Sequence, residues 1–237
     1  MPERDTPTAR SYASHPLPPA DAPWREVDFS VVDLETTGLN PATDEIISFA
    51  TVTVSRGTVR LDDTRYALVR PNHMPDWDTI RIHGLRDTDL EDAPPLSELL
   101  DDLLEALTGR AIVAHVAAVE RGFLQAALQS AGLDLRNPIV DTAALDRGLR
   151  RRRGPRVGSD PIGLSDMCRE LGLPVHRPHH ADGDALTTAQ AFIVLATHLD
   201  SFEPQTLGSL QRLAEEDGDR GILSRLRSLG SRLRARP

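Results

Sequence analysis

The stretch VVDLETTGL at residues 31–39 decides how the rest of the chain is interpreted. Its apolar, β-branched beginning predicts a buried strand from residue 27 to 33. Asp33 and Glu35 stand two residues apart, so the period of two along a strand points both carboxylates to one face. Buried carboxylates are costly unless paired or metal-bound, and no arginine stands nearby in sequence to neutralise these two. A hard-cation site is predicted, and a solvated pair of acids at a strand end is the alternative.

Outward from this strand, the chain alternates between strand and helix patterns. Apolar, β-branched runs predict strands at 45–54, 58–69, 111–114 and around 139–140. Apolar spacings of three and four predict helices at 96–107, 118–131, 142–150, 163–171 and 183–199, with a loop region at 71–95. Three strands followed by strand-helix alternation predict a mixed sheet covered by helices, an α/β architecture.

The composition is that of one large domain with short appendages. The 237 residues carry a formal net charge of -9, which argues against a generally basic nucleic-acid coat but not against a metal site built from acids. The single cysteine, Cys168, is expected to be a core thiol. No apolar run approaches a membrane span and no signal peptide is evident, so a cytoplasmic protein without membrane contact is expected.

Three segments are predicted along the chain. Residues 1–26 hold six prolines and few large apolar residues, which predicts a flexible tail. Residues 27–200 form the main domain, and residues 201–237 form an extension of amphipathic helices near 206–216 and 221–235. Residues 220–237 hold six arginines and no acid. This last helix has two possible roles: it packs back on the domain, or it binds a protein or nucleic-acid partner.

A second constellation of polar residues opens the helix that starts near residue 183. His179 and Asp184 stand where a loop meets that helix N-terminus, in the sequence HHADGDA. A histidine there can accept a proton from water near neutral pH. His180 and Asp182 are interpreted as solvated loop residues.

These motifs resemble those of the DnaQ-like 3′-to-5′ exonucleases, the DEDDh branch, over residues 27–200. The first family motif, D-x-E-T-T-G, is met by residues 33–38, and the third, H-x-A-x-x-D-A, by residues 179–185, both without gaps. Smaller similarities lie at 82–85, 140–142 and 164–171. The resemblance implies a ribonuclease H-like exonuclease domain with a mixed five-stranded sheet flanked by helices, extended here by C-terminal helices.

The second family motif, H-N-x-x-F-D-x-x-F-L, is matched with changes. Here it reads HVAAVERGFL from His115 to Leu124, so that Glu120 replaces the usual aspartate, and Val116 and Val119 replace Asn and Phe. Glutamate keeps the charge and adds one methylene. An ordinary helix N-terminal acid is the alternative interpretation of Glu120.

The resemblance also implies the roles of the site residues. Asp33, Glu35, Glu120 and Asp184 would bind two divalent cations, Mg²⁺ or Mn²⁺, that clamp the scissile phosphate, with His179 as general base. Substrate-binding residues would be Thr36, near the 3′-hydroxyl, and Leu39, wedged against bases, together with Thr37, Gly38 and His115.

Three functions follow as hypotheses. The first is a 3′-to-5′ exonuclease on single-stranded DNA or frayed 3′ ends, of the proofreading or repair type known from the polymerase III epsilon subunit. RNA 3′-end trimming is its nearest rival, because only contacts with the 2′-hydroxyl discriminate the two. A nucleic-acid or partner-binding module with weakened catalysis is the third. The arginines at 150–153, with Arg147 and Arg156, either meet a phosphate backbone or form a solvated helix end.

Overall fold

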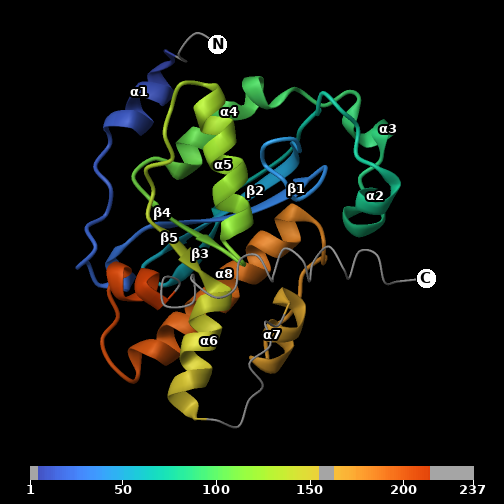
Figure 1. Ribbon diagram of the computed structural model, residues 1–237. Coiled ribbons are helices and arrows are strands. Elements are labelled where there is room, and N and C mark those ends of the chain that lie inside the picture. Colours follow the sequence, from blue (N-terminus) through green and yellow to red (C-terminus); the bar gives the residue numbers. More distant parts are fainter. Residues whose placement is uncertain (1–4, 155–162, 214–237) are drawn as a thin grey trace.

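The computed structural model describes residues 5–154 and 163–213. Its centre is a sheet of five strands in the order β3-β2-β1-β4-β5 (Figure 1). The strands are β1 (Phe29–Thr36), β2 (Ile46–Ser55), β3 (Thr58–Leu68), β4 (Ala111–Ala114) and β5 (Ile139–Asp141). β1, β2 and β3 pair antiparallel, whereas β1, β4 and β5 pair parallel. The mixed five-stranded sheet expected from the sequence is therefore confirmed.

Helices cover both faces of this sheet. On one side lie α4 (Leu96–Leu107) and α5 (Ala118–Ser130), and on the other α6 (Thr142–Arg153), α7 (Leu164–Glu170) and α8 (Ala181–Asp200) (Figure 1). Each of these helices agrees with its sequence prediction to within three residues at either end. Spacings of three and four between apolar residues put one stripe of each helix against the sheet, which is why the sequence could predict them.

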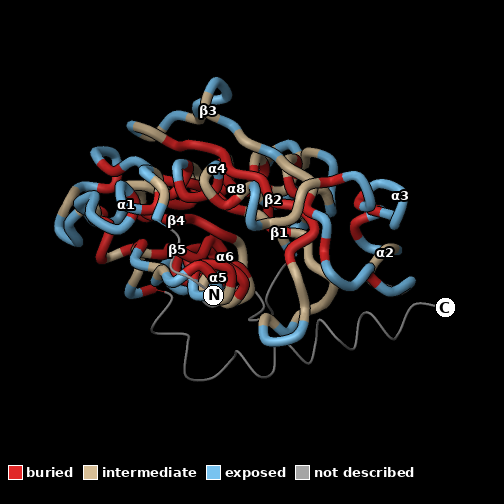
Figure 2. The backbone as a smooth tube through the Cα atoms, turned by 90° about the horizontal axis from the view of Figure 1, so that it is seen from above, coloured by how far each residue is buried: buried red, intermediate tan, exposed pale blue. Residues whose placement is uncertain are grey.

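Side chains of β1 alternate between the two apolar cores. Phe29 and Val31 join the core under α6, α7 and α8, whereas Val32 and Leu34 join the core under α4 and α5. The same alternation directs Asp33 and Glu35 to the face that α8 covers. Figure 2 shows this buried centre, with exposed residues concentrated at the periphery. Cys168 is fully buried in the core on the α8 side, as expected.

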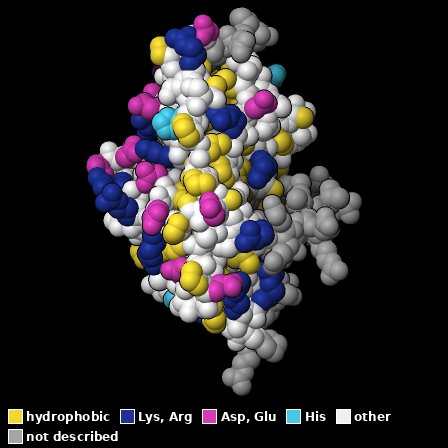
Figure 3. Space-filling model, turned by 90° about the vertical axis from the view of Figure 1, so that its left-hand side faces the viewer, with side chains coloured by type: hydrophobic (Ala, Val, Ile, Leu, Met, Phe, Trp, Pro, Cys, Tyr) yellow, Lys and Arg dark blue, Asp and Glu magenta, His cyan; other side chains and the backbone are white. Residues whose placement is uncertain are grey.

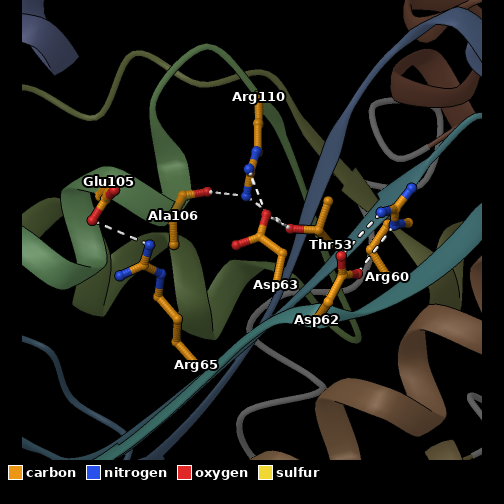
Figure 4. Close-up of polar contacts among 8 residues, drawn as sticks. All are labelled: Thr53, Arg60, Asp62, Asp63, Arg65, Glu105, Ala106 and Arg110. Carbon is orange, nitrogen blue, oxygen red and sulfur yellow. Dashed lines mark hydrogen bonds and ion pairs between the residues drawn. The ribbon is translucent and has the colours of Figure 1, made fainter.

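The edge strand β3 is fixed to the body of the protein by polar contacts (Figure 4). Asp63 accepts hydrogen bonds from Arg110 at 2.7 Å and from Thr53 at 2.9 Å. Arg65, on the same strand, pairs with Glu105 of α4 at 3.1 Å. Burial acts to raise the pKa of Asp63, but the Thr53 hydroxyl and the Arg110 charge hold it below its usual value. Charged side chains of this kind also discourage pairing of the free edge with another chain.

The N-terminal segment differs from the flexible tail that the proline content predicts for residues 1–26. Residues 7–14 form α1 (Pro7–Ser14), in which Thr6 caps the helix and Tyr12 is buried. Proline at the first helical position is compatible with a helix because its missing N–H has no partner there anyway. A short 3-10 helix, η1 (Trp24–Glu26), follows and buries Trp24. Two large aromatic side chains thus fix a segment that composition alone describes as mobile.

The region between residues 71 and 95 also departs from the sequence prediction of a loop. It contains two short helices, α2 (Trp77–His83) and α3 (Asp87–Leu90). Asp76 caps α2 by accepting from the backbone of Thr79 at 2.9 Å, and Gly84 ends the helix in the left-handed conformation. These caps are local signals, but seven and four residues are too short for apolar periodicity to predict.

The C-terminal extension is described only in its first part. Residues 207–213 are helical, and Leu207, Leu210 and Leu213 join the core on the α8 side. The backbone of Leu207 donates to the carbonyl of Ala22 at 3.0 Å, so this segment lies beside the N-terminal one. The second predicted helix, at 221–235, lies outside the described residues. Among the residues described, no helix combines the length and apolarity that a membrane crossing requires.

Candidate active site

Three carboxylates converge at the carboxyl end of β1. Asp33 and Glu35 come from the strand, and Asp184 comes from the first turn of α8, which lies on the same face. One oxygen of each carboxylate lies within 4.8 Å of the others. Residues separated by about 150 positions in the sequence are therefore brought together, as the sequence motifs require.

The loop before α8 is shaped so that His179 meets Asp184. His179 adopts a left-handed backbone with a φ of 63°, and its N–H donates to Asp184 Oδ2 at 2.9 Å. Gly183 makes the close turn possible, because a Cβ there would collide with the carbonyl oxygens of His176 and Arg177. His179 is exposed, and burial raises the pKa of Asp184 although the backbone N–H and the charge of His179 oppose the rise. His179 is therefore close to the acids and open to solvent.

The fourth predicted acid, Glu120, stands in the first turn of α5 and is buried, with 7% of its surface exposed. Its Oε2 atom has no hydrogen-bond partner among the residues that the structure describes. Glu120 does not form part of the three-carboxylate group. In addition to burial, the charge of Glu120 raises the pKa of Asp33, and the charge of Glu35 raises the pKa of Glu120. Glu120 is thus an electrostatic neighbour of that group.

Burial and mutual repulsion perturb all four acids. Burial, followed by the charges of Glu35, Glu120 and Asp184, raises the pKa of Asp33 well above its ordinary value. Burial raises the pKa values of both Glu35 and Glu120 to about 8, with Asp184 adding to the first. Burial also raises the pKa of Asp184, against the opposing effect of the His179 N–H. The acid cluster, defined as these four residues, therefore carries negative charge that His179 and His180, near Asp184, offset only in part.

These residues fit one or more hard divalent cations. The donors are all carboxylate oxygens, which Mg²⁺ and Mn²⁺ prefer over nitrogen or sulfur ligands. The remaining negative charge and the unpartnered Oε2 of Glu120 are features that a bound cation would satisfy. Asp33, Glu35 and Asp184 would hold it, with Glu120 in support.

Three of the residues predicted to bind substrate, Thr36, Thr37 and Gly38, directly follow Glu35, and they also stabilise the turn after β1. Thr36 donates to the carbonyl of Gly38 at 2.6 Å, and Thr37 Oγ1 accepts from the backbone of Glu45 at 2.9 Å. A Cβ at Gly38 would collide with the Asp44 carboxylate. Thr37 and Gly38 thus have a structural explanation that needs no substrate.

The other two predicted substrate-binding residues are Leu39 and His115, which stand on different segments. Leu39 is half-buried directly after Gly38, so part of the side chain faces solvent. The imidazole of His115 follows β4, and its Nδ1 lies 3.0 Å from Thr142 Oγ1 at the start of α6. His115 is therefore anchored to the neighbouring strand-to-helix connection.

The structure also brings to the site residues that the sequence did not single out. Ser48 of β2 is paired with Glu35 of β1. Asp33 is paired in the same way with Ala50 of β2, and Ala50 is paired with Tyr66 of β3. Burial raises the pKa of Tyr66, and nearby Asp182 raises it further. No local signal in the sequence marks these positions, because strand register depends on pairing between distant segments.

The arginines at the end of α6 form ion pairs with the protein itself. Arg150 contacts Asp146 at 2.7 Å and Glu170 at 2.6 Å, and Arg152 contacts Glu203 at 2.7 Å. Position 156 lies outside the described residues. On the face that Figure 3 shows, arginines and acids among the coloured residues are interspersed. Because Arg150 and Arg152 are already paired with acids of the protein, these contacts favour a helix end over a phosphate-binding surface, and the helix end is ion-paired where the sequence predicted a solvated one.

Comparisons with known proteins show the family and the fold of this chain. The family model RNase_T, described as "Exonuclease", matches residues 30–192. The chain is 30% identical over 196 residues to a DNA polymerase III of PolC type from Thermotoga maritima, covering 82% of this chain and 14% of that protein. It is 29% identical to the 3′-5′ exonuclease DinG of Bacillus subtilis, covering 79% of this chain and 19% of that protein. The chain thus spans less than a fifth of the length of these relatives.

Solved structures share the fold at lower identity. Exonuclease I of E. coli in complex with a dT13 oligonucleotide matches with a TM-score of 0.66 and 16% identity, covering 74% of this chain and 42% of that one. Exonuclease X in complex with 5′ overhanging duplex DNA matches with a TM-score of 0.58 and 20% identity, covering 77% and 99%. The family match spans all three sequence motifs and most of the described fold. This chain therefore belongs to the exonuclease family, among its DnaQ-like members with a ribonuclease H-like fold.

Proposed function

We propose that this protein is a metal-dependent 3′-to-5′ exonuclease that releases nucleoside monophosphates from the 3′ ends of nucleic acids. The observation that carries the proposal is the convergence of Asp33, Glu35 and Asp184, whose oxygens lie within 4.8 Å of one another. Membership of the exonuclease family and the name of the DinG relative support the direction of cleavage. The cofactor proposed is a pair of Mg²⁺ or Mn²⁺ ions held by the acid cluster.

The reaction breaks the bond between phosphorus and the 3′-oxygen of the preceding nucleotide and adds the oxygen of water to phosphorus. Divalent cations in such a site neutralise charge on the phosphate and on the attacking and leaving oxygens. His179 is exposed beside Asp184, so its imidazole is the group proposed to accept the proton of the attacking water. The hydrogen bond from the backbone N–H of His179 to Asp184 fixes the backbone of His179 next to this carboxylate. Thr36 and Leu39 are proposed to contact the terminal nucleotide.

DNA is the proposed substrate, in the form of single strands or frayed 3′ ends. The PolC-type relatives are DNA polymerases by name, and two of the solved structures contain DNA. RNA trimming is the alternative within the same chemistry. The protein partner considered for the C-terminal helix falls on residues outside those described, so it stays a hypothesis from the sequence.

A binding module with weakened catalysis is the second candidate function. The observation that favours it is Glu120 in place of the usual aspartate, held in a buried position. Against it, a pure binding module has no need of the His179 base or of three converging carboxylates. The exonuclease is therefore the better-supported proposal.

The test is a cleavage assay with purified protein, Mg²⁺ or Mn²⁺, and 5′-labelled single-stranded DNA, RNA and mismatched duplex. The expected product is a ladder that shortens from the 3′ end, fastest on single-stranded DNA. Asp33→Ala and Asp184→Ala should abolish cleavage, and His179→Ala should slow turnover while metal binding is largely kept. His180→Ala, at the N-cap of α8, and Asp182→Asn, in its first turn, are matched controls next to Asp184 and should remain active. Absence of cleavage with either metal would favour the binding module instead.

A further inference from the structure

Ser48 lies directly beside one of the acids of the cluster. It stands on β2, where the antiparallel register pairs it with Glu35 of β1. Paired residues of neighbouring strands point to the same face and have Cβ atoms about 5 Å apart. The neighbouring pairs Asp33 with Ala50 and Val31 with Val52 also follow this register, and Val31, Ala50 and Val52 all join the core on the α8 side. The Ser48 hydroxyl therefore shares the face of Glu35.

The hydroxyl of Ser48 is buried, and it has no hydrogen-bond partner in the part of the chain that the structure describes. The residue is 1% exposed, and its Oγ forms no hydrogen bond with any described part of the chain. On its other side the register pairs it with Leu68, and Ala50 is the next residue on the same face of β2. Both neighbours are apolar, so Glu35 is the polar side chain that the pairing places next to it. A buried hydroxyl without a partner is unfavourable unless it serves an acceptor in another state of the protein.

We propose that Ser48 is a positioning residue for Glu35: its hydroxyl donates to the Glu35 carboxylate when the acid cluster holds divalent cations. This inference rests on the proposed metal-dependent function. An ionised carboxylate is a strong hydrogen-bond acceptor, and the Ser hydroxyl can rotate about χ1 without moving the strand. Groups that hydrogen-bond metal-ligating side chains fix their orientation, and removing them typically weakens metal binding by about 10- to 100-fold.

Ser30 provides a matched control within the same sheet. It is a strand serine with 0% exposure whose Oγ also lacks a partner within the described ranges. It lies on β1, three residues before Asp33, so strand alternation points it to the opposite face, toward the core under α4 and α5. Ser30→Ala and Ser48→Ala thus remove the same group from equally buried positions, but only Ser48 faces the acid cluster.

The experiment measures Mn²⁺ affinity by titration calorimetry and unfolding in chelator for the full chain and its variants. Ser48→Ala should bind Mn²⁺ about 10- to 100-fold more weakly than the unmodified protein. Its unfolding midpoint in chelator should be unchanged or higher, because an unpaired buried hydroxyl has been removed. Ser48→Thr, which keeps a hydroxyl, should retain most of the affinity. Ser30→Ala should bind Mn²⁺ as the unmodified protein does.

A double-mutant cycle tests whether Ser48 acts through Glu35. In a Glu35→Ala background, Ser48→Ala should cause no further loss of Mn²⁺ affinity, because the acceptor that Ser48 serves is gone. Unchanged Mn²⁺ affinity in Ser48→Ala, or a lower midpoint in chelator with affinity kept, would overturn the inference. Those results leave the exonuclease proposal intact. Failure of the unmodified protein to bind Mn²⁺ or to cleave would instead overturn the proposed function itself.

Discussion

Val116 adopts a left-handed backbone, with a φ of 59°, where the chain turns from β4 into α5. The turn is held by its N–H, which donates to Asp141 Oδ1 at 3.0 Å. A β-branched residue is strongly disfavoured in this region, whereas asparagine and glycine enter it readily. Asparagine, the residue of the second family motif at this position, suits this backbone better than valine does.

Val116→Asn is expected to stabilise the protein. Relief of the left-handed backbone strain should raise the free energy of unfolding by about 1 kcal/mol, measured by urea denaturation. Val119→Asn is the comparison, because Val119 packs against the core under α4 and α5 and its replacement should destabilise the protein. A Val116→Asn variant that is less stable than the unmodified protein would contradict this account.

Glu120→Asp is expected to preserve or raise activity. The shorter side chain restores the residue that the family carries at this position and keeps the charge, at a stability cost of about 0.8 kcal/mol for the lost methylene. The turnover rate on single-stranded DNA is the measurement, with unfolding as a check on folding. Glu120→Gln, which removes the charge at similar size, should lower activity by about tenfold or more. Complete loss of activity in a folded Glu120→Asp variant would show that the second motif has been misaligned.

At the scale of elements, α1 is attached to the body of the protein by side-chain hydrogen bonds. The Tyr12 hydroxyl donates to Asn137 Oδ1 at 2.8 Å and accepts from the backbone N–H of Arg136 at 3.2 Å. Thr6, which caps the helix, also donates to Asp101 of α4 at 2.9 Å. The helix thereby joins α4 to the segment that leads into β5, and it covers part of the core on that side.

Tyr12→Phe should lower the free energy of unfolding by about 1–3 kcal/mol, because it leaves the buried Asn137 oxygen without its donor. Urea denaturation would measure the loss. Ser14→Ala, an exposed change on the same helix, should stay within about 0.5 kcal/mol. Equal stabilities of the Tyr12→Phe variant and the unmodified protein would mean that residues 5–14 do not hold this position in solution.

At the scale of the whole molecule, the acid cluster links stability to pH and metal. Burial raises the pKa values of Glu35 and Glu120 to about 8 from the ordinary 4.5, so the folded state binds these protons more tightly than the unfolded chain. Their contribution to stability is therefore complete below pH 4.5 and is lost as the pH rises to about 8. Bound cations would offset this loss.

In chelator, the free energy of unfolding is expected to fall as the pH rises from 4.5 to about 8. The fall should be larger in the unmodified protein than in the Glu120→Gln variant, and the difference between the two should be a few kcal/mol. Saturating Mn²⁺ should raise the melting temperature more at pH 8 than at pH 5, since protons compete for the same oxygens. Calorimetric scans of both proteins at both pH values provide the measurement. A pH profile in chelator that is the same for the two proteins would show that Glu120 is not buried as an acid.

The sequence by itself determined the elements whose signals are local. The period of two placed Asp33 and Glu35 on one face, the apolar spacings of three and four gave the long helices, and the ungapped motifs around Asp33 and Asp184 indicated the family. Each signal lies within a few residues of the feature it predicts. The reason is that side chains return to the same face after about 3.6 residues in a helix and after about two residues in a strand.

Tertiary structure decided what depends on contacts between distant segments. The sequence could not indicate that Tyr12 would find Asn137, so a proline-rich segment was predicted as a tail, or that Ser48 would stand beside Glu35. Strand register and the docking of terminal segments are fixed by which buried surfaces fit together across the fold. The sequence motifs thus identify the residues of the acid cluster, whereas tertiary packing determines which other side chains lie next to them.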